Sequence, residues 1–145
     1  IREEINHKQG IGFSLKSIGV LYYYKGDYEK AVNYLKKFFA IQKEIGIKES
    51  DLNTITYLNL ANKQLGNEYD EKEIHTLIKE QEYIEYRVNL RLFQLFEDKS
   101  YLETAHNQIQ EKVDAMDDEL KEKFINYPIP KQIIEEYNKV FNPPS

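Results

Sequence analysis

The sequence predicts an all-α fold in a chain of ordinary single-domain size. Its 145 residues are 41% hydrophobic and 31% charged, a composition that can supply a folded core. The last glycine is Gly66 and the first proline is Pro128, so the 61 residues from 67 to 127 contain neither. A β-sandwich or an α/β fold needs frequent turns, and turns favour these two residue types. We therefore expect helices throughout.

The clearest helical pattern lies in residues 12–45 and predicts two antiparallel helices. Apolar residues recur there at spacings of three and four, which places them on one face of each helix. Gly26 and Asp27 predict the turn, because glycine accepts the left-handed conformation that ends a helix and aspartate caps the next helix. Gly19 leaves room for the neighbouring helix. The pattern consists of Leu15, Ile18, Gly19, Tyr22, Gly26, Asp27, Ala31, Leu35 and Phe38.

This order of residues resembles the tetratricopeptide (TPR) repeat, a helix pair with a bulky residue, a Leu-Gly step and an aromatic residue, followed by alanine and a large apolar group. Lys43 stands where that family often has proline, so the second helix is expected to run toward Gly46. The resemblance implies antiparallel helix pairs that stack as a short right-handed α-solenoid with a concave groove. The chain as a whole is similar to TPR segments of bacterial signalling proteins.

Weaker copies of the pattern follow the first. Residues 52–82 and residues 86–116 each predict a degenerate repeat, and the turn glycines Gly26 and Gly66 are 40 residues apart. Residues 1–10 predict the end of a preceding repeat, closed by Gly10 or Gly12.

The end of the chain, residues 117–141, predicts a C-terminal cap. A helix through Phe124 is expected to be broken by the prolines at 128 and 130, with a last helix over residues 131–141. Together the repeats and the cap are expected to form one TPR-like domain over residues 1–145. Because the chain starts at Ile1 and not at methionine, we expect it to be a piece of a longer protein.

Charge and cysteine content exclude several classes of protein. The net charge of −5 argues against nucleic-acid binding, which needs a basic surface. Residues 1–66 carry a net charge of +3 and residues 67–145 carry −8. Without cysteine the chain forms no disulfide, which fits a cytoplasmic protein. No long apolar run or signal peptide is present, so no membrane association is expected.

Two Glu-x-x-His steps are the strongest indication of chemistry. Glu4 with His7 and Glu103 with His106 have the spacing by which helical bundles hold two metal ions. Such a site also needs glutamates from two further helices, and glutamate is common in this chain. No nucleophile with a neighbouring base and no phosphate-binding loop is found. We therefore predict no enzyme, no cofactor and no metal, and keep a di-metal helical bundle as a remote alternative.

The TPR resemblance also implies a partner-binding groove. Tyr22, Tyr23 and Tyr24 are consecutive, and because consecutive helical residues point about 100° apart they cannot all be core. Tyr22 is the packing residue of the repeat, so Tyr23 and Tyr24 are expected to be displayed. By the family registration the groove is lined by Phe13, Lys16, Val20, Tyr23, Tyr24, Asn53, Thr56, Lys63, Arg87, Arg91 and Gln94.

Two functions from different classes follow. The first is a non-catalytic protein–protein interaction scaffold of a bacterial signalling or regulatory protein, whose groove takes a peptide, a partner segment or another part of its own parent chain. The alternative is a structural or dimerisation spacer that holds output domains. The opposite charge of the two halves favours this alternative, since unlike ends of two copies would attract, forming a homodimer.

The first repeat generates a stability prediction. If Ala31 lies at the tightest crossing of the two helices, Ala31→Leu overpacks it and should lower the free energy of unfolding by about 1–3 kcal/mol. Urea unfolding followed by circular dichroism measures the change. A variant as stable as the wild type would mean that the registration of the repeat is wrong.

Overall fold

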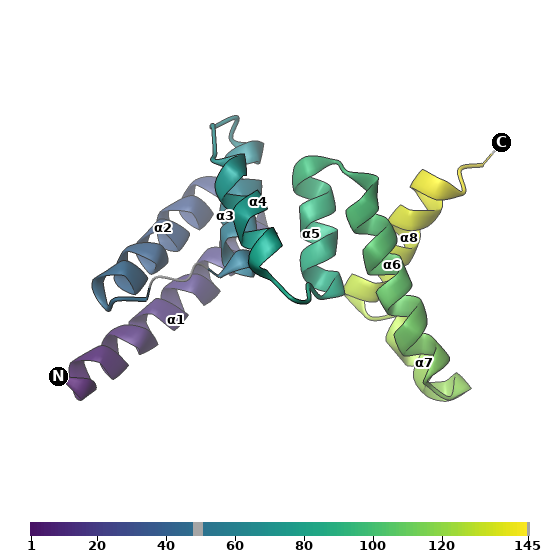
Figure 1. The fold of residues 1–145 in the computed structure, drawn as a ribbon, viewed down its shortest axis with the longest axis horizontal. Helices are drawn as coiled ribbons and strands as arrows, with labels where there is room; N and C mark the ends of the chain where they lie inside the picture. The colour runs from purple at the N-terminus through teal and green to yellow at the C-terminus, as the bar shows by residue number, and fades with distance from the viewer. Residues whose placement is uncertain (48–50, 145) are drawn as a thin grey trace. The chain divides into compact units, whose positions relative to one another are not determined.

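The computed structural model describes residues 1–47 and 51–144, and the regular structure in these ranges is entirely helical (Figure 1). The prediction of an all-α fold is confirmed. The chain divides into two compact units, Ile1–Gln81 and Glu82–Ser145, and each is described by itself. In a stack of helix pairs each pair contacts only its neighbours, so one repeat domain can also divide into compact units. The division therefore does not test the expected single repeat domain, which stays a prediction.

The first unit contains four helices, and its first two form an antiparallel hairpin (Figure 1). Gly26 has φ 82°, and the amides of Gly26 and Asp27 donate to the last carbonyls of the first helix at 3.0 Å. The Asp27 carboxylate then accepts from the Lys30 amide at 3.2 Å, which caps the second helix. The predicted turn is confirmed. The helices are α1 (Arg2–Lys25), α2 (Tyr28–Glu44), α3 (Leu52–Gln64) and α4 (Glu71–Glu80).

The hairpin closes tightly where α1 crosses α2. A Cβ added at Gly19 would lie 2.7 Å from Leu35 Cγ and 2.8 Å from Leu35 Cδ2. Only glycine fits at this distance, as its place in the repeat predicted. Ala31 on α2 is fully buried and clusters with Val32 and with Ala61 of α3. Small residues on α2 and α3 thus let the third helix dock on the hairpin.

One boundary differs from the prediction. Residues 1–10 do not end a separate helix at Gly10 or Gly12, because α1 continues through both glycines. A glycine inside a helix costs about 1 kcal/mol relative to alanine but does not stop it. Gly12 is also buried against α2, where an added Cβ would lie 3.6 Å from Ile41 and 3.7 Å from Phe38. These are ordinary van der Waals distances, so the helix continues through Gly12 with its packing on α2 intact.

The second unit has its own core. Its helices α5 (Tyr86–Phe96) and α6 (Lys99–Asp114) are antiparallel, and α8 (Pro128–Phe141) packs on α6 (Figure 1). The turn between α5 and α6 contains no glycine, and Glu97 adopts the left-handed conformation with φ 56°. The core residues are Leu90, Leu102, Ala105, Ile109, Val113 and Ile133.

The two helices expected near the end of the chain are present, with a shifted boundary, and their role as a cap stays a prediction. Asp117 caps α7 (Asp118–Ile125) by accepting from the Leu120 amide at 2.8 Å. The last helix begins at Pro128 and not at residue 131. Amides in the first turn of a helix have no partner within it, so prolines at 128 and 130 are tolerated there. The two prolines therefore start the helix that they were expected to precede.

The close approach at Gly19 predicts a contrast between two glycines of α1. Gly19→Ala places a methyl group inside Leu35 and should lower the free energy of unfolding by about 1–3 kcal/mol. Gly10→Ala meets no atom within 4 Å and should raise it by up to about 1 kcal/mol, because alanine is the better helix former. Urea unfolding of both variants measures the difference. Equal changes in both would contradict the packing of the hairpin.

Candidate functional site

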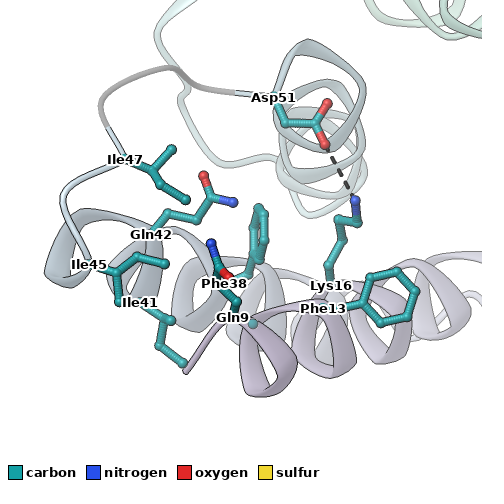
Figure 2. Close-up of a pocket in the computed structure, with 10 residues that line it drawn as sticks. Gln9, Phe13, Lys16, Phe38, Ile41, Gln42, Ile45, Ile47 and Asp51 are labelled. Atoms are coloured by element: carbon teal, nitrogen blue, oxygen red, sulfur yellow. Dashed lines mark ion pairs between the residues drawn. The ribbon is translucent and has the colours of Figure 1, made fainter. Parts of the chain in front are cut away.

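The residues predicted to line a groove are divided between the two units. Lys16, Val20, Tyr23, Tyr24, Asn53, Thr56 and Lys63 belong to the first unit, and Arg87, Arg91 and Gln94 belong to the second. In the first unit a pocket of about 230 Å³ lies beside Lys16, between α1, α2 and the start of α3 (Figure 2). We take this pocket as the candidate site. It is lined by Gln9, Gly12, Phe13, Lys16, Phe38, Ile41, Gln42, Ile45, Ile47 and Asp51.

The walls of the pocket are mainly apolar. Phe38 is 4% exposed and closes one side, while Ile41, Ile45 and Ile47 lie opposite Phe13 and Lys16 (Figure 2). Space for the pocket exists because Gly12 presents no side chain to it. The amides of Gln9 and Gln42 add groups that donate and accept hydrogen bonds. This combination of apolar walls and a few polar groups is typical of a binding pocket.

Lys16 and Asp51 form the charged part of the rim. The Lys16 ammonium lies 3.5 Å from the Asp51 carboxylate (Figure 2). It also lies 5.9 Å from the centre of the Phe13 ring and 5.7 Å from that of Phe38, within the range of a cation–π contact. Phe13 is 65% exposed, so a large aromatic surface is available beside the charge. A ligand at this rim meets an ion pair and an aromatic face together.

The Asp51 carboxylate is held by the helix that it begins. One oxygen accepts from the Asn53 amide at 3.1 Å, and the other accepts from the Thr54 hydroxyl at 2.6 Å. These are the bonds of an N-cap residue, which satisfy otherwise unpaired groups at a helix start. The start of α3 therefore positions Asp51, and Asp51 positions Lys16.

A cluster of tyrosines lies near the other end of α1. The Tyr24 and Tyr57 hydroxyls are 2.6 Å apart, and the Tyr23 ring makes edge contacts with the rings of Tyr24, Tyr28 and Tyr57. Tyr24 is 55% exposed, as a displayed residue should be. Tyr23 is half-buried and packs in the core cluster of the first unit, so its predicted display is wrong. Three rings crowd it because α3 brings Tyr57 against this end of α1.

The remaining predicted groove residues do not gather at the pocket. Thr56 is fully buried, and its hydroxyl donates to the Leu52 carbonyl at 2.6 Å, so it offers nothing to a partner. Val20 and Lys63 are half-buried and Asn53 is exposed. In the second unit, Arg91 is 4% exposed and donates to the Gln94 side chain at 3.0 Å, whereas Arg87 is exposed.

Most residues that line the pocket were missed by the sequence analysis. Phe38 was assigned to the core, and Gln9, Gln42 and Asp51 carried no periodic signal. Ile45 and Ile47 flank Gly46, which ends α2 in the left-handed conformation, and an apolar contact commonly accompanies such a helix end. Asp51 directly before the apolar start of α3 was also recognisable as a cap.

Neither Glu-x-x-His step contributes a residue to the lining of this pocket. Within residues 1–47 and 51–144, no three His, Cys, Asp or Glu side chains are grouped as a metal site requires. Glu103 is exposed, and the His106 ring stacks on Tyr137 of α8 with centroids 3.6 Å apart. One side of the His106 ring is therefore covered by α8.

Comparison of the chain with protein-family models, with curated proteins and with solved structures finds no match. Across the described ranges, every helix is too short or too polar to cross a membrane.

The burial of His106 predicts a pH effect on stability. Burial lowers the pKa of His106 from its ordinary value of 6.5, so the folded state favours the neutral ring. The unfolded state then binds more protons as the pH falls below that value, and stability declines. The contribution is complete above the ordinary pKa of 6.5 and is lost as the pH falls through the lowered pKa of the folded state. His106→Phe keeps the ring contact with Tyr137 without titrating, so its stability should fall less over this range.

Urea unfolding of both proteins at several pH values gives the comparison. Equal losses of stability in the wild type and in His106→Phe would contradict the effect of burial on this histidine.

Proposed function

We propose that the chain is a TPR-type interaction module of a bacterial signalling or regulatory protein, and that it binds a peptide or protein segment without catalysis. The first helix pair supports the TPR assignment, because Gly19, Gly26 and Ala31 do what the repeat requires of them. In this proposal α1–α2, α3–α4 and α5–α6 stack as a right-handed solenoid, and α7 with α8 forms its cap. A cytoplasmic location belongs to the same proposal and is favoured by the absence of cysteine.

The observation that carries the proposal is the pocket beside Lys16. Its volume of about 230 Å³ exceeds the cavity of about 150 Å³ that accommodates benzene in an engineered protein core. It therefore has room for a branched aliphatic or aromatic side chain of a partner. Burying such a side chain supplies about 1.5–3 kcal/mol. The amides of Gln9 and Gln42 are placed to bond the partner backbone next to that anchor.

The rim adds a preference for partner polarity. Lys16 and Asp51 already neutralise one another, so the rim offers a charge pair and not a single charge. A partner with a polar or zwitterionic neighbour beside its apolar anchor matches this rim better than a highly charged one. The exposed Phe13 ring supplies a further contact surface for the same neighbour. We therefore propose a partner segment with one apolar anchor flanked by uncharged polar residues.

Filling the pocket tests this function. Peptides selected from a random library on the wild-type chain are measured by fluorescence polarisation against Gly12→Leu, whose side chain occupies the pocket. Affinity should fall at least about tenfold, since the anchor loses its place. Lys16→Ala should weaken the same peptides less, because it removes one part of the rim.

The control is Ala40→Leu, which places a leucine side chain at an exposed position of α2 outside the pocket and should leave the affinity unchanged. Circular dichroism verifies that all variants are folded. Peptides that bind Gly12→Leu as tightly as the wild type would contradict the proposal. In that case the spacer alternative, which needs no pocket, would be favoured.

A further inference from the structure

α1 exposes apolar side chains on the face opposite the hairpin. Ile11 is 41% exposed, Ile18 is 37% exposed and Leu21 is 52% exposed. Residues spaced by seven and by three lie on one side of a helix, so the three form a single stripe. Scattered apolar residues on a surface are ordinary, but exposed apolar residues aligned along one helix are a candidate for an interaction site.

The stripe has the spacing of a coiled-coil seam. Steps of three and four residues join Glu4, His7, Ile11, Ser14, Ile18, Leu21 and Lys25. These seven residues are the a and d positions of three heptads and the start of a fourth, the positions that face a partner helix. The seam is charged at both ends, and its apolar residues Ile11, Ile18 and Leu21 lie around Ser14 and toward Lys25.

A hollow lies in the middle of the same face. It is lined by residues of α1 alone, namely Asn6, His7, Gly10, Ile11, Ser14 and Leu15. A Cβ added at Gly10 would meet no atom within 4 Å, so the hollow is open to solvent. The large side chains of Ile11 and Ile18 thus project beside a gap left by Gly10 and Ser14. The large side chains of a second copy of this face have a shape that fills the gap.

We propose that this face pairs with the same face of a second copy of the chain, with the two α1 helices antiparallel. A two-fold axis makes such an interface self-complementary, because each contact occurs twice. The charges fit this arrangement: Glu3 and Glu4 lie in the first turn of α1 and Lys25 lies in its last turn. In antiparallel packing, Glu3 and Glu4 of each copy meet Lys25 of the other copy. In parallel packing, the two Lys25 side chains would lie next to each other and repel.

One register satisfies charge and shape together. Setting Glu3 of one copy opposite Lys25 of the other sets Ile18 opposite Gly10, so each Ile18 enters the hollow of its partner. Ser14 then faces its own copy on the two-fold axis. The helix has 24 residues and is about 36 Å long, so the interface is one helix wide. An interface of this size gives a weak dimer.

The first test is the oligomeric state of the full 145-residue chain. Analytical ultracentrifugation at about 1–100 µM, where a small interface associates, should show a monomer–dimer equilibrium for the wild type. Ile18→Glu places a charge in the hollow and should abolish the dimer over this range. Asn33→Glu, at an exposed position of α2, is the matched control and should dimerise as the wild type does. A monomeric wild type, or a dimer that survives Ile18→Glu, would overturn the proposal.

The second test determines the relative orientation of the two α1 helices. Because the chain contains no cysteine, a disulfide can form only at a cysteine that is introduced. Under mild oxidation Ser14→Cys should form a disulfide-linked dimer, because residue 14 meets itself on the axis. Leu21→Cys should not, because in the antiparallel register it faces His7. Both variants would link if the helices were parallel. Linking of Leu21→Cys, or failure of Ser14→Cys to link, would contradict the proposed pairing.

Discussion

The contact between Gly19 and Leu35 sets the distance between α1 and α2, and the features of the first unit depend on that distance. A Cβ at Gly19 would overlap two side-chain atoms of Leu35 and lie 3.3 Å from its backbone nitrogen. With the helices this close, Ala31 can be fully buried while Val32 and Ala61 pack beside it. The third helix then docks on the hairpin, and its first turn delivers Asp51 to Lys16. The steric constraint at Gly19 thus fixes the position of the Lys16–Asp51 ion pair about one helical turn away.

The sequence predicted what is encoded locally. The turn at Gly26 and Asp27 and the cap at Asp117 depend on residues within a few positions of one another, and both are present. The close approach at Gly19 joins residues 16 positions apart, but the short turn between the two helices brings them together. The pocket depends on Gln9, Phe38 and Asp51, which come from three helices and share no periodic pattern. Similarly, Tyr23 is half-buried because a tyrosine 34 residues later reaches it, which the local helix pattern does not encode.

The helix boundaries show how context changes the effect of a residue. Gly10 and Gly12 were expected to end a helix because glycine ends several helices here, at Gly26 and Gly66. Those two adopt positive φ and are followed by chain that turns away. Gly10 and Gly12 lie inside a helix whose flanking turns pack on α2, and a helical glycine costs less than the packing contributes. Prolines at 128 and 130 behave likewise, since a first turn needs no amide partner.

Gly10 and Gly12 also divide α1 into two functional faces. Gly12 opens the pocket on the side that packs against α2, and Gly10 opens the hollow on the opposite side. Side chains two positions apart on a helix point about 200° apart, so the pocket and the hollow lie on nearly opposite sides of α1. A segment bound in the pocket and a second copy on the outer stripe would then touch different side chains of one helix. The two proposed interactions are therefore sterically compatible, because the pocket and the hollow share no lining residue.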